Sequence, residues 1–255
     1  MIDRRELLEK ARQRNLTLGM IEKDYVLGWL LFGLKDIRGL TFKGGTALSK
    51  IYFPETWRLS EDLDFVYMED FQDITSALER VFRNIEKQSG IRLRPKSQYS
   101  NPDYLQLKIQ YTAVLGKNWI KVDVTREAPI DKVTKKPLKR MYSDYPDFRV
   151  AVETIEEIAA QKIRSLIERR KCRDFFDAWQ LMKMKLDKKK LSSLLGQKFS
   201  YKMLEFPDLP DFFPEDLDEI IGSYWKRELG RLVQPVPDME KTISELKASI
   251  ASLLR

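Results

Sequence analysis

The sequence predicts an α+β protein with an α/β front half and a helical back half. Apolar residues recur at helical spacing through most of the first forty positions and again at 70–88. Two stretches, 62–67 and 105–125, instead alternate with a period of two, which is typical of strands. From about residue 154 onward helical spacing prevails. These patterns place a domain boundary near residue 150, which divides the chain into domains 1–150 and 151–255.

In the front half, the helical spacing of the first forty residues breaks near Asn15. The glycine pair Gly44-Gly45 then predicts a turn that leads into a short helix. The 62–67 alternation predicts a strand, and 70–88 predicts an amphipathic helix. The 105–125 alternation predicts a β-hairpin with its turn at residues 115–118.

In the back half, apolar spacing predicts four helices. They fall at residues 154–167, 175–182, 214–233 and 237–254. Pro214 and Pro235 mark the starts of the last two, because proline is tolerated in the first turn of a helix but not inside it. No internal repeat or low-complexity segment interrupts this organisation.

Composition excludes several kinds of chemistry. The 255 residues include no histidine and one cysteine, Cys172, which excludes Ser-His-Asp and Cys-His catalysis, an internal disulfide and most zinc sites. Lysine and arginine (46) exceed aspartate and glutamate (39) by seven, which suits a polyanionic partner or simply a charged surface. No apolar run is long enough to span a bilayer and no secretion signal is evident, so we expect a cytoplasmic protein.

Asp62 and Asp64 are the strongest candidates for catalysis. In an extended strand they share one face, while Leu63 and Phe65 point to the core. Two neighbouring carboxylates repel each other unless a cation lies between them, and Mg²⁺ suits such a site because it also bridges substrate phosphates. A solvated acidic strand edge is the alternative interpretation.

The glycine pair adds a candidate phosphate site. Gly44-Gly45, followed at once by a helix, offers unhindered backbone N–H groups that can hold a triphosphate. Taken alone, the pair favours an ordinary turn. The order of glycine pair, helix and Asp-x-Asp strand favours the phosphate site.

Asp123 is the candidate third carboxylate. It alternates with the apolar Val122 and Val124 and therefore lies on the polar face of its strand. Three carboxylates on adjacent strands can hold two cations, one activating a hydroxyl and one neutralising a leaving pyrophosphate. A surface aspartate on a hairpin is the alternative.

Charged residues in the back half are further candidates. Lys162 lies close to the apolar stripe of its helix, where it could reach phosphates or simply extend its ammonium to solvent. Asp174 and Asp177, at i and i+3, share a helix face, and capping or salt bridges explain that spacing equally well.

Together these residues resemble the AbiEii family of nucleotidyltransferase toxins, which also includes the MenT toxins, from type IV toxin–antitoxin and abortive-infection modules. Five blocks carry the resemblance in order, over roughly residues 40 to 180. They are residues 43–50 (KGGTALSK), 58–65 (RLSEDLDF), 121–124 (KVDV), 156–163 (EEIAAQKI) and 169–177 (RRKCRDFFD).

The resemblance implies a polymerase-β-like nucleotidyltransferase core with a mixed sheet, followed by a helical C-terminal half that contributes to the active site. It implies Mg²⁺, or alternatively Mn²⁺, held by Asp62, Asp64 and Asp123, with an NTP as substrate. Further catalytic residues would be Lys162, Asp174 and Asp177. The residues implied to bind the nucleotide are Lys43, Gly44, Gly45, Thr46, Arg58, Ser60 and Arg173.

The resemblance also implies partners: an RNA acceptor, with the 3′ end of tRNA as the expected one, a cognate antitoxin protein, and no membrane. Modification of tRNA would block translation. Two alternatives stay open, namely the same fold acting on a protein or small-molecule hydroxyl, and a nucleotide-binding regulator without turnover.

Overall fold

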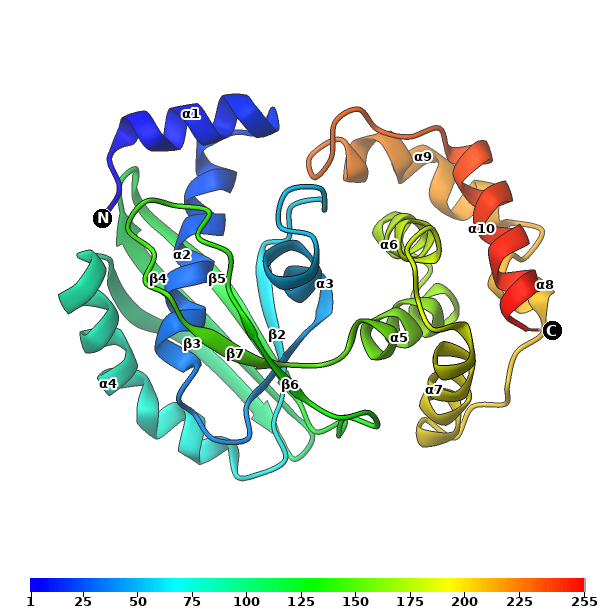
Figure 1. The fold of residues 1–255 in the computed structure, drawn as a ribbon, viewed down its shortest axis with the longest axis horizontal. Helices are drawn as coiled ribbons and strands as arrows, with labels where there is room; N and C mark the ends of the chain where they lie inside the picture. Colours follow the sequence, from blue (N-terminus) through cyan, green and yellow to red (C-terminus); the bar gives the residue numbers. More distant parts are fainter. Residues whose placement is uncertain (255) are drawn as a thin grey trace. The chain divides into compact units, whose positions relative to one another are not determined.

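The computed structural model describes residues 1–254, which divide into two compact units (Figure 1). The first unit comprises Met1–Pro129 and Val133–Glu153. The second comprises Ile130–Lys132 and the chain from Thr154 onward. None of the helices in residues 1–254 is long and apolar enough to cross a membrane.

The first unit is built on a seven-stranded mixed sheet with the order β3-β4-β5-β2-β1-β7-β6. The pairs β2–β5 and β1–β7 are parallel, and the other neighbours are antiparallel. The strands are β1 (Thr41–Lys43), β2 (Asp62–Val66), β3 (Arg92–Asn101), β4 (Tyr104–Ala113), β5 (Gly116–Thr125), β6 (Thr134–Pro137) and β7 (Arg149–Val152).

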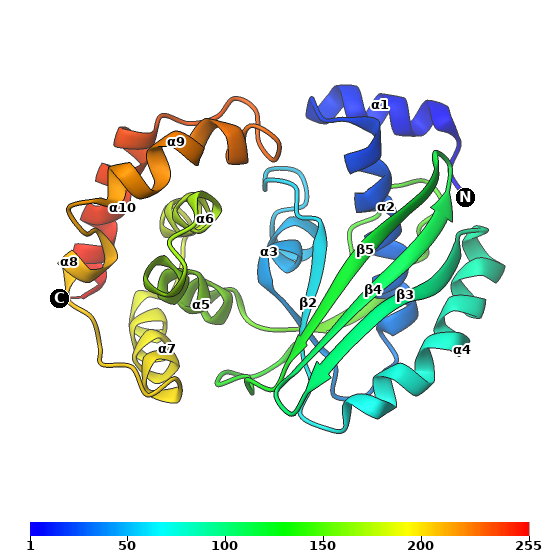
Figure 2. The ribbon, with the colours of Figure 1, turned by 180° about the vertical axis from the view of Figure 1, so that it is seen from behind.

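One face of this sheet is apolar and covered by helices. Leu63, Leu107 and Val122 point to this face and are almost fully buried. Helices α2 (Leu18–Leu34) and α4 (Phe71–Ser89) pack against each other and against the strands, and Figure 2 shows β3, β4 and β5 in front of α2. The apolar stripe of α4 supplies much of this contact, because its buried residues recur at helical spacing. The opposite face of the sheet is left for polar side chains.

Three short helical segments complete the first unit. Helix α1 (Arg4–Arg14) ends at Asn15, whose left-handed backbone produces the expected break before α2. Helix α3 (Gly44–Ala47) follows β1 directly and continues as a π-helical turn, η1 (Leu48–Tyr52). The expected short helix is present, but it begins at Gly44, so the glycine pair forms its first turn rather than a turn before it.

The second unit is helical. Its helices are α5 (Ile155–Glu168), α6 (Cys172–Met182), α7 (Lys188–Tyr201), α8 (Leu209–Phe212), α9 (Leu217–Leu229) and α10 (Met239–Leu253). Helix α5 packs against α6 and α7, while α6 also contacts α9 and α10. The segment Ile130–Lys132 joins this unit because Glu157 on α5 accepts the backbone N–H groups of Ile130 (2.8 Å) and Asp131 (3.0 Å).

The α+β class, the mixed sheet and the helical C-terminal half are confirmed. The position of the hairpin turn was wrong: the chain turns at residues 114–115, and β5 already begins at Gly116. Gly116 has a φ of +112°, which a side chain would disfavour, so the glycine fits the first residue of the returning strand. Strand β3 and helix α7 were not expected from the sequence.

Candidate active site

The predicted carboxylates meet on the polar face of the sheet. Strands β2 and β5 are parallel, with Asp62 opposite Lys121 and Asp64 opposite Asp123. Paired residues of adjacent strands point to the same face, so Asp62, Asp64 and Asp123 lie on one side, away from the apolar core. We call these three residues the carboxylate face. Its alternation with buried Leu63, Val122 and Val124 explains why the strands expose it.

A lysine side chain already lies between two of these carboxylates. The Lys121 ammonium is 2.7 Å from an Asp123 oxygen and 3.5 Å from an Asp62 oxygen. The sequence placed Lys121 on this face but gave it no role. It reduces the repulsion that three neighbouring carboxylates would otherwise exert on one another.

The surroundings of Asp62 and Lys121 shift the pKa values of both groups. Burial raises the pKa of Asp62; Lys121 opposes this shift, while the Asp64 and Asp123 carboxylates add to it. The pKa of Lys121 is lowered by its own burial, but the hydrogen bond to Asp123 and the charge of Asp62 outweigh this and raise it overall. The shift of Asp62 therefore comes mainly from burial, whereas the shift of Lys121 comes from the carboxylates beside it.

Asp123 is held in place by two residues of β4 that sequence reasoning missed. The Tyr104 hydroxyl donates to Asp123 at 2.6 Å, and the Gln106 amide donates to the same oxygen at 3.2 Å. Burial and the bond to Asp123 raise the pKa of Tyr104 to about 12, so it stays a donor at neutral pH. The observed hairpin register, in which Gln106 lies opposite Asp123, brings these residues together, and the turn expected at residues 115–118 would have given a different register.

The glycine pair lies against the carboxylate face. Gly44 has a φ of +76°, and a Cβ atom placed on it would come within 2.5 Å of an Asp64 carboxylate oxygen. A side chain at this position is therefore excluded both by the left-handed backbone and by the close approach of Asp64. Lys43, the residue before the pair, lies opposite Asp64 in the β1–β2 register.

The remaining residues of the expected nucleotide site gather around Gly45. A Cβ atom on Gly45 would lie 3.2 Å from the Ser60 hydroxyl and 3.4 Å from the Arg58 guanidinium. Thr46 is buried and donates its hydroxyl to the Asp62 carbonyl, which ties the start of α3 to β2. The structure thus brings together, within the first unit, every residue of that unit that the sequence assigned to the site.

A buried ion pair anchors this helical turn. Lys50 on η1 donates to the carboxylate of Asp24 at 2.9 Å and to its carbonyl at 2.8 Å, and both side chains are 4% exposed. The Tyr142 hydroxyl donates to the other Asp24 oxygen at 2.9 Å. These bonds connect η1 to α2, so they hold the glycine pair in position beside β2.

The carboxylate face suits a divalent cation in the kind of ligand and in charge. Oxygen ligands on adjacent strands are what Mg²⁺ and Mn²⁺ prefer. Within residues 1–254, however, no three acidic or thiol side chains are arranged closely enough to hold a metal ion as they stand. The Lys121 ammonium contacts Asp123 and Asp62 instead, so a cation bound to both of these carboxylates would compete with it.

The candidates of the second unit form a buried cluster. The Lys162 ammonium on α5 is 2.9 Å from Asp177 and 3.6 Å from Asp174, both on α6 and both with fully buried side chains. Arg169 donates to both oxygens of Asp174, at 2.8 and 2.7 Å. We call these four residues the helical ion-pair cluster. Arg173 is half-buried and forms no ion pair within residues 1–254.

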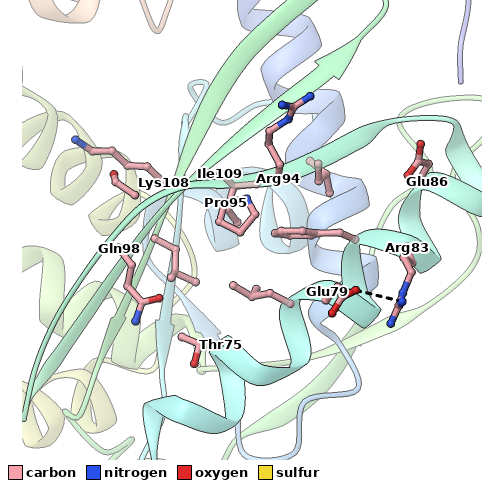
Figure 3. A pocket seen from close by; sticks show the side chains of 14 residues that line it. Thr75, Glu79, Arg83, Glu86, Arg94, Pro95, Gln98, Lys108 and Ile109 are labelled. Atoms are coloured by element: carbon pink, nitrogen blue, oxygen red, sulfur yellow. Dashed lines mark ion pairs between the residues drawn. The ribbon is translucent and has the colours of Figure 1, made fainter.

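The first unit also contains a pocket of about 360 Å³ that is separate from the carboxylate face (Figure 3). It lies between α4 and the strands β3 and β4 and is lined by apolar side chains such as Leu78, Phe82 and Leu107. Leu107 and Ile109 point to the apolar side of the sheet, whereas Asp123 points to the polar side. None of the candidate site residues lines this pocket.

Comparison with known proteins places this arrangement in a family. The family model described as "Nucleotidyl transferase AbiEii toxin, Type IV TA system" matches residues 29–249. No curated protein sequence matches the chain significantly.

Two solved structures have a similar fold. The nucleotidyltransferase toxin MenT4 from Mycobacterium tuberculosis H37Rv is similar over 100% of this chain and 90% of its own, with a TM-score of 0.79 and 19% identity. JHP933 from Helicobacter pylori is similar over 93% of each chain, with a TM-score of 0.62 and 20% identity. The family model covers most of both units, and a toxin of a type IV system has an antitoxin as its partner. The chain therefore belongs to the AbiEii family of nucleotidyltransferase toxins of type IV toxin–antitoxin systems.

Proposed function

We propose that this toxin transfers a nucleoside monophosphate from an NTP to an RNA acceptor, the 3′ end of tRNA, and so blocks translation. The observation that carries the proposal is the carboxylate face beside the glycine pair, with Asp64 against Gly44. The excess of basic residues, 46 against 39, supports a polyanionic acceptor.

In the proposed reaction, the acceptor hydroxyl oxygen forms a bond to the α-phosphorus of the NTP. The bond from that phosphorus to the pyrophosphate oxygen breaks, and pyrophosphate leaves. Mg²⁺, or alternatively Mn²⁺, held by Asp62, Asp64 and Asp123, would neutralise charge that develops on the phosphate oxygens. The chain has no histidine, so the hydroxyl proton passes to a carboxylate of this face.

The chain's own groups orient the nucleotide. Backbone N–H groups at Gly44, Gly45 and Thr46, in the first turn of α3, would contact a triphosphate, and Arg58 and Ser60 lie close to Gly45. Lys43, opposite Asp64, would add positive charge for the phosphates. The roles of Lys162, Arg173, Asp174 and Asp177 near the nucleotide stay predictions of the family resemblance.

The test is to incubate the purified protein with total RNA, Mg²⁺ and each α-³²P-labelled NTP in turn, and to resolve the products on a denaturing gel. We expect one NTP to label a band in the tRNA range. Asp62→Ala should abolish the label, because it removes a metal ligand worth several kcal/mol of transition-state stabilisation, a loss of about 1,000-fold or more. Glu86→Ala, exposed on α4, is the matched control and should label normally.

Three outcomes would contradict the proposal. Labelling that survives in Asp62→Ala would remove the carboxylate face from the reaction. Labelling of protein or of a small molecule instead of RNA would favour the alternative acceptors, and binding of NTP without any product would favour a regulator.

A further inference from the structure

An exposed tryptophan lies among three lysines on the same side of the sheet as the carboxylate face. Trp119 on β5 is 39% exposed. The ammonium groups of Lys23, Lys96 and Lys108 lie 5.8, 5.2 and 5.6 Å from the centre of its ring. They come from α2, β3 and β4, so three separate elements converge on one indole. We call these four residues the Trp119 platform.

Positive charge on this platform is only partly compensated. Lys23 forms an ion pair with Glu61 at 3.1 Å. Neither Lys96 nor Lys108 pairs with a carboxylate in the described chain, residues 1–254. Cations so close to one ring repel each other, and a cation–π contact at an exposed site is weak. An anion bound among them would relieve the repulsion.

The fold of β3 helps to bring Lys96 to this place. The β3–β4 register shifts between Pro95 and Ser97, so Lys96 is an extra residue at a β-bulge. Lys108, on β4, lies opposite Lys121 on β5. Lys121, which contacts Asp62 and Asp123 of the carboxylate face, therefore lies beside Lys108 of the platform on the neighbouring strand.

The platform and the glycine pair lie next to different strands of the carboxylate face. Gly44 follows β1, which pairs with β2, whereas Trp119 is on β5, across β2 from β1. Trp119, Lys121 and Asp123 alternate along one face of β5, so Trp119 is four residues, roughly 13 Å, from Asp123. Gly45 lies against Ser60, two residues before Asp62, and Trp119 comes two residues before Lys121, the partner of Asp62 in the register. The glycine pair and the platform thus lie toward the same end of β2 and β5, next to different strands.

We propose that the Trp119 platform binds the single-stranded end of the RNA acceptor, with a base stacked on the indole and phosphates contacting Lys96, Lys108 and Lys23. This inference rests on the proposed function. Aromatic rings bordered by lysines bind single-stranded nucleic acid because every base has a face that stacks and every linkage carries a charge. An acceptor held here extends along β5 toward the carboxylate face.

The test measures equilibrium binding of a short, fluorescein-labelled single-stranded RNA by anisotropy, without NTP or metal. Trp119→Ala should weaken binding about 5- to 100-fold, the usual effect of losing one stacked base. Trp119→Phe, which keeps a stacking ring, should retain most of the affinity. Circular dichroism and the thermal midpoint check that both variants fold.

The lysines are tested through salt dependence. In Lys96→Ala/Lys108→Ala, the slope of log K against log salt should decrease by roughly 1.4, since each phosphate contact to a single strand contributes about 0.7. Lys87→Ala, exposed on α4, is the matched charge control and should leave the slope unchanged.

The outcomes separate this inference from the proposed function. If Trp119→Ala binds RNA like the wild type, or loses NTP binding instead, the platform is not the acceptor subsite, even if RNA is labelled normally. If no RNA is labelled by the wild type but Trp119→Ala still loses RNA affinity, the transfer function fails and the binding platform stands.

Discussion

The carboxylate face and the helical ion-pair cluster contain the same kinds of residues in opposite environments. On the carboxylate face, the Asp62 side chain is 36% exposed, and one ammonium is shared between two of three carboxylates. In the helical cluster, the Asp174 and Asp177 side chains are 0% exposed and two cations compensate two carboxylates. A ligand can therefore reach the Asp62 carboxylate from solvent, whereas the side chains of Asp174 and Asp177 have no exposed surface in the second unit. Solvent access is the difference between these two groups of carboxylates.

This comparison predicts its largest effect on stability in the helical cluster. Asp177→Asn should lower the free energy of unfolding by about 3–5 kcal/mol, because it leaves the buried Lys162 without its nearest carboxylate. Urea denaturation measures the effect through the shift of the unfolding midpoint.

Two variants control this prediction. Asp62→Asn, on the exposed carboxylate face, should change the midpoint little. The double variant Lys162→Met/Asp177→Leu should regain much of the stability, since apolar residues can replace a buried ion pair. If Asp177→Asn leaves the unfolding midpoint unchanged, the two regions contribute more equally to stability than their burial indicates.

An intermediate effect is expected at Lys121. In EDTA, Lys121→Met should lower the stability of the protein by about 1 kcal/mol or less, because the ion pairs are partly exposed and the carboxylates then repel each other. Added Mg²⁺ should raise the thermal midpoint more in this variant than in the wild type, because the ion no longer competes with the ammonium. Lys108→Met is the control, and equal Mg²⁺ shifts in all three proteins would exclude Lys121 as a competitor.

The smallest effect is expected at a partly buried ion pair of the second unit, between Lys190 and Asp131. Partial burial would raise the pKa of Asp131, but hydrogen bonds from Lys190 and Thr154 outweigh it and lower the pKa from 3.8 to about 2. A carboxylate whose pKa is lower in the folded protein than in the unfolded protein stabilises the fold at pH values above its unfolded-state pKa. This stabilisation is lost as the pH falls through its folded-state pKa. Asp131→Asn should therefore cost under about 1 kcal/mol at pH 7.

The pH dependence of that difference is the measurement. The stability of Asp131→Asn and of the wild type should converge as the pH falls from 4 toward 2. A difference that stays constant over this range would assign the effect to hydrogen bonding by the side chain rather than to its charge.

Much of the candidate site could be predicted from local sequence patterns. The period of two places Asp62, Asp64 and Asp123 on the polar faces of their strands, and Gly44 has the positive φ that a glycine tolerates best. Strand β3 escaped prediction because it is an edge strand exposed along nearly its whole length, so no apolar alternation marks it.

The sequence by itself determined which residues belong to the polar face and which to the core, because side-chain direction in a strand follows from its period. It also excluded catalysis by histidine and an internal disulfide, because the chain has no histidine and only one cysteine. Only the tertiary structure decided that Lys121 lies between carboxylates, that Lys162, Asp174 and Asp177 are buried, and that three lysines surround Trp119. These features depend on strand register and on helix packing between segments that are distant in the sequence. A long, flexible charged side chain can point in many directions, so its place in the sequence does not reveal its partner.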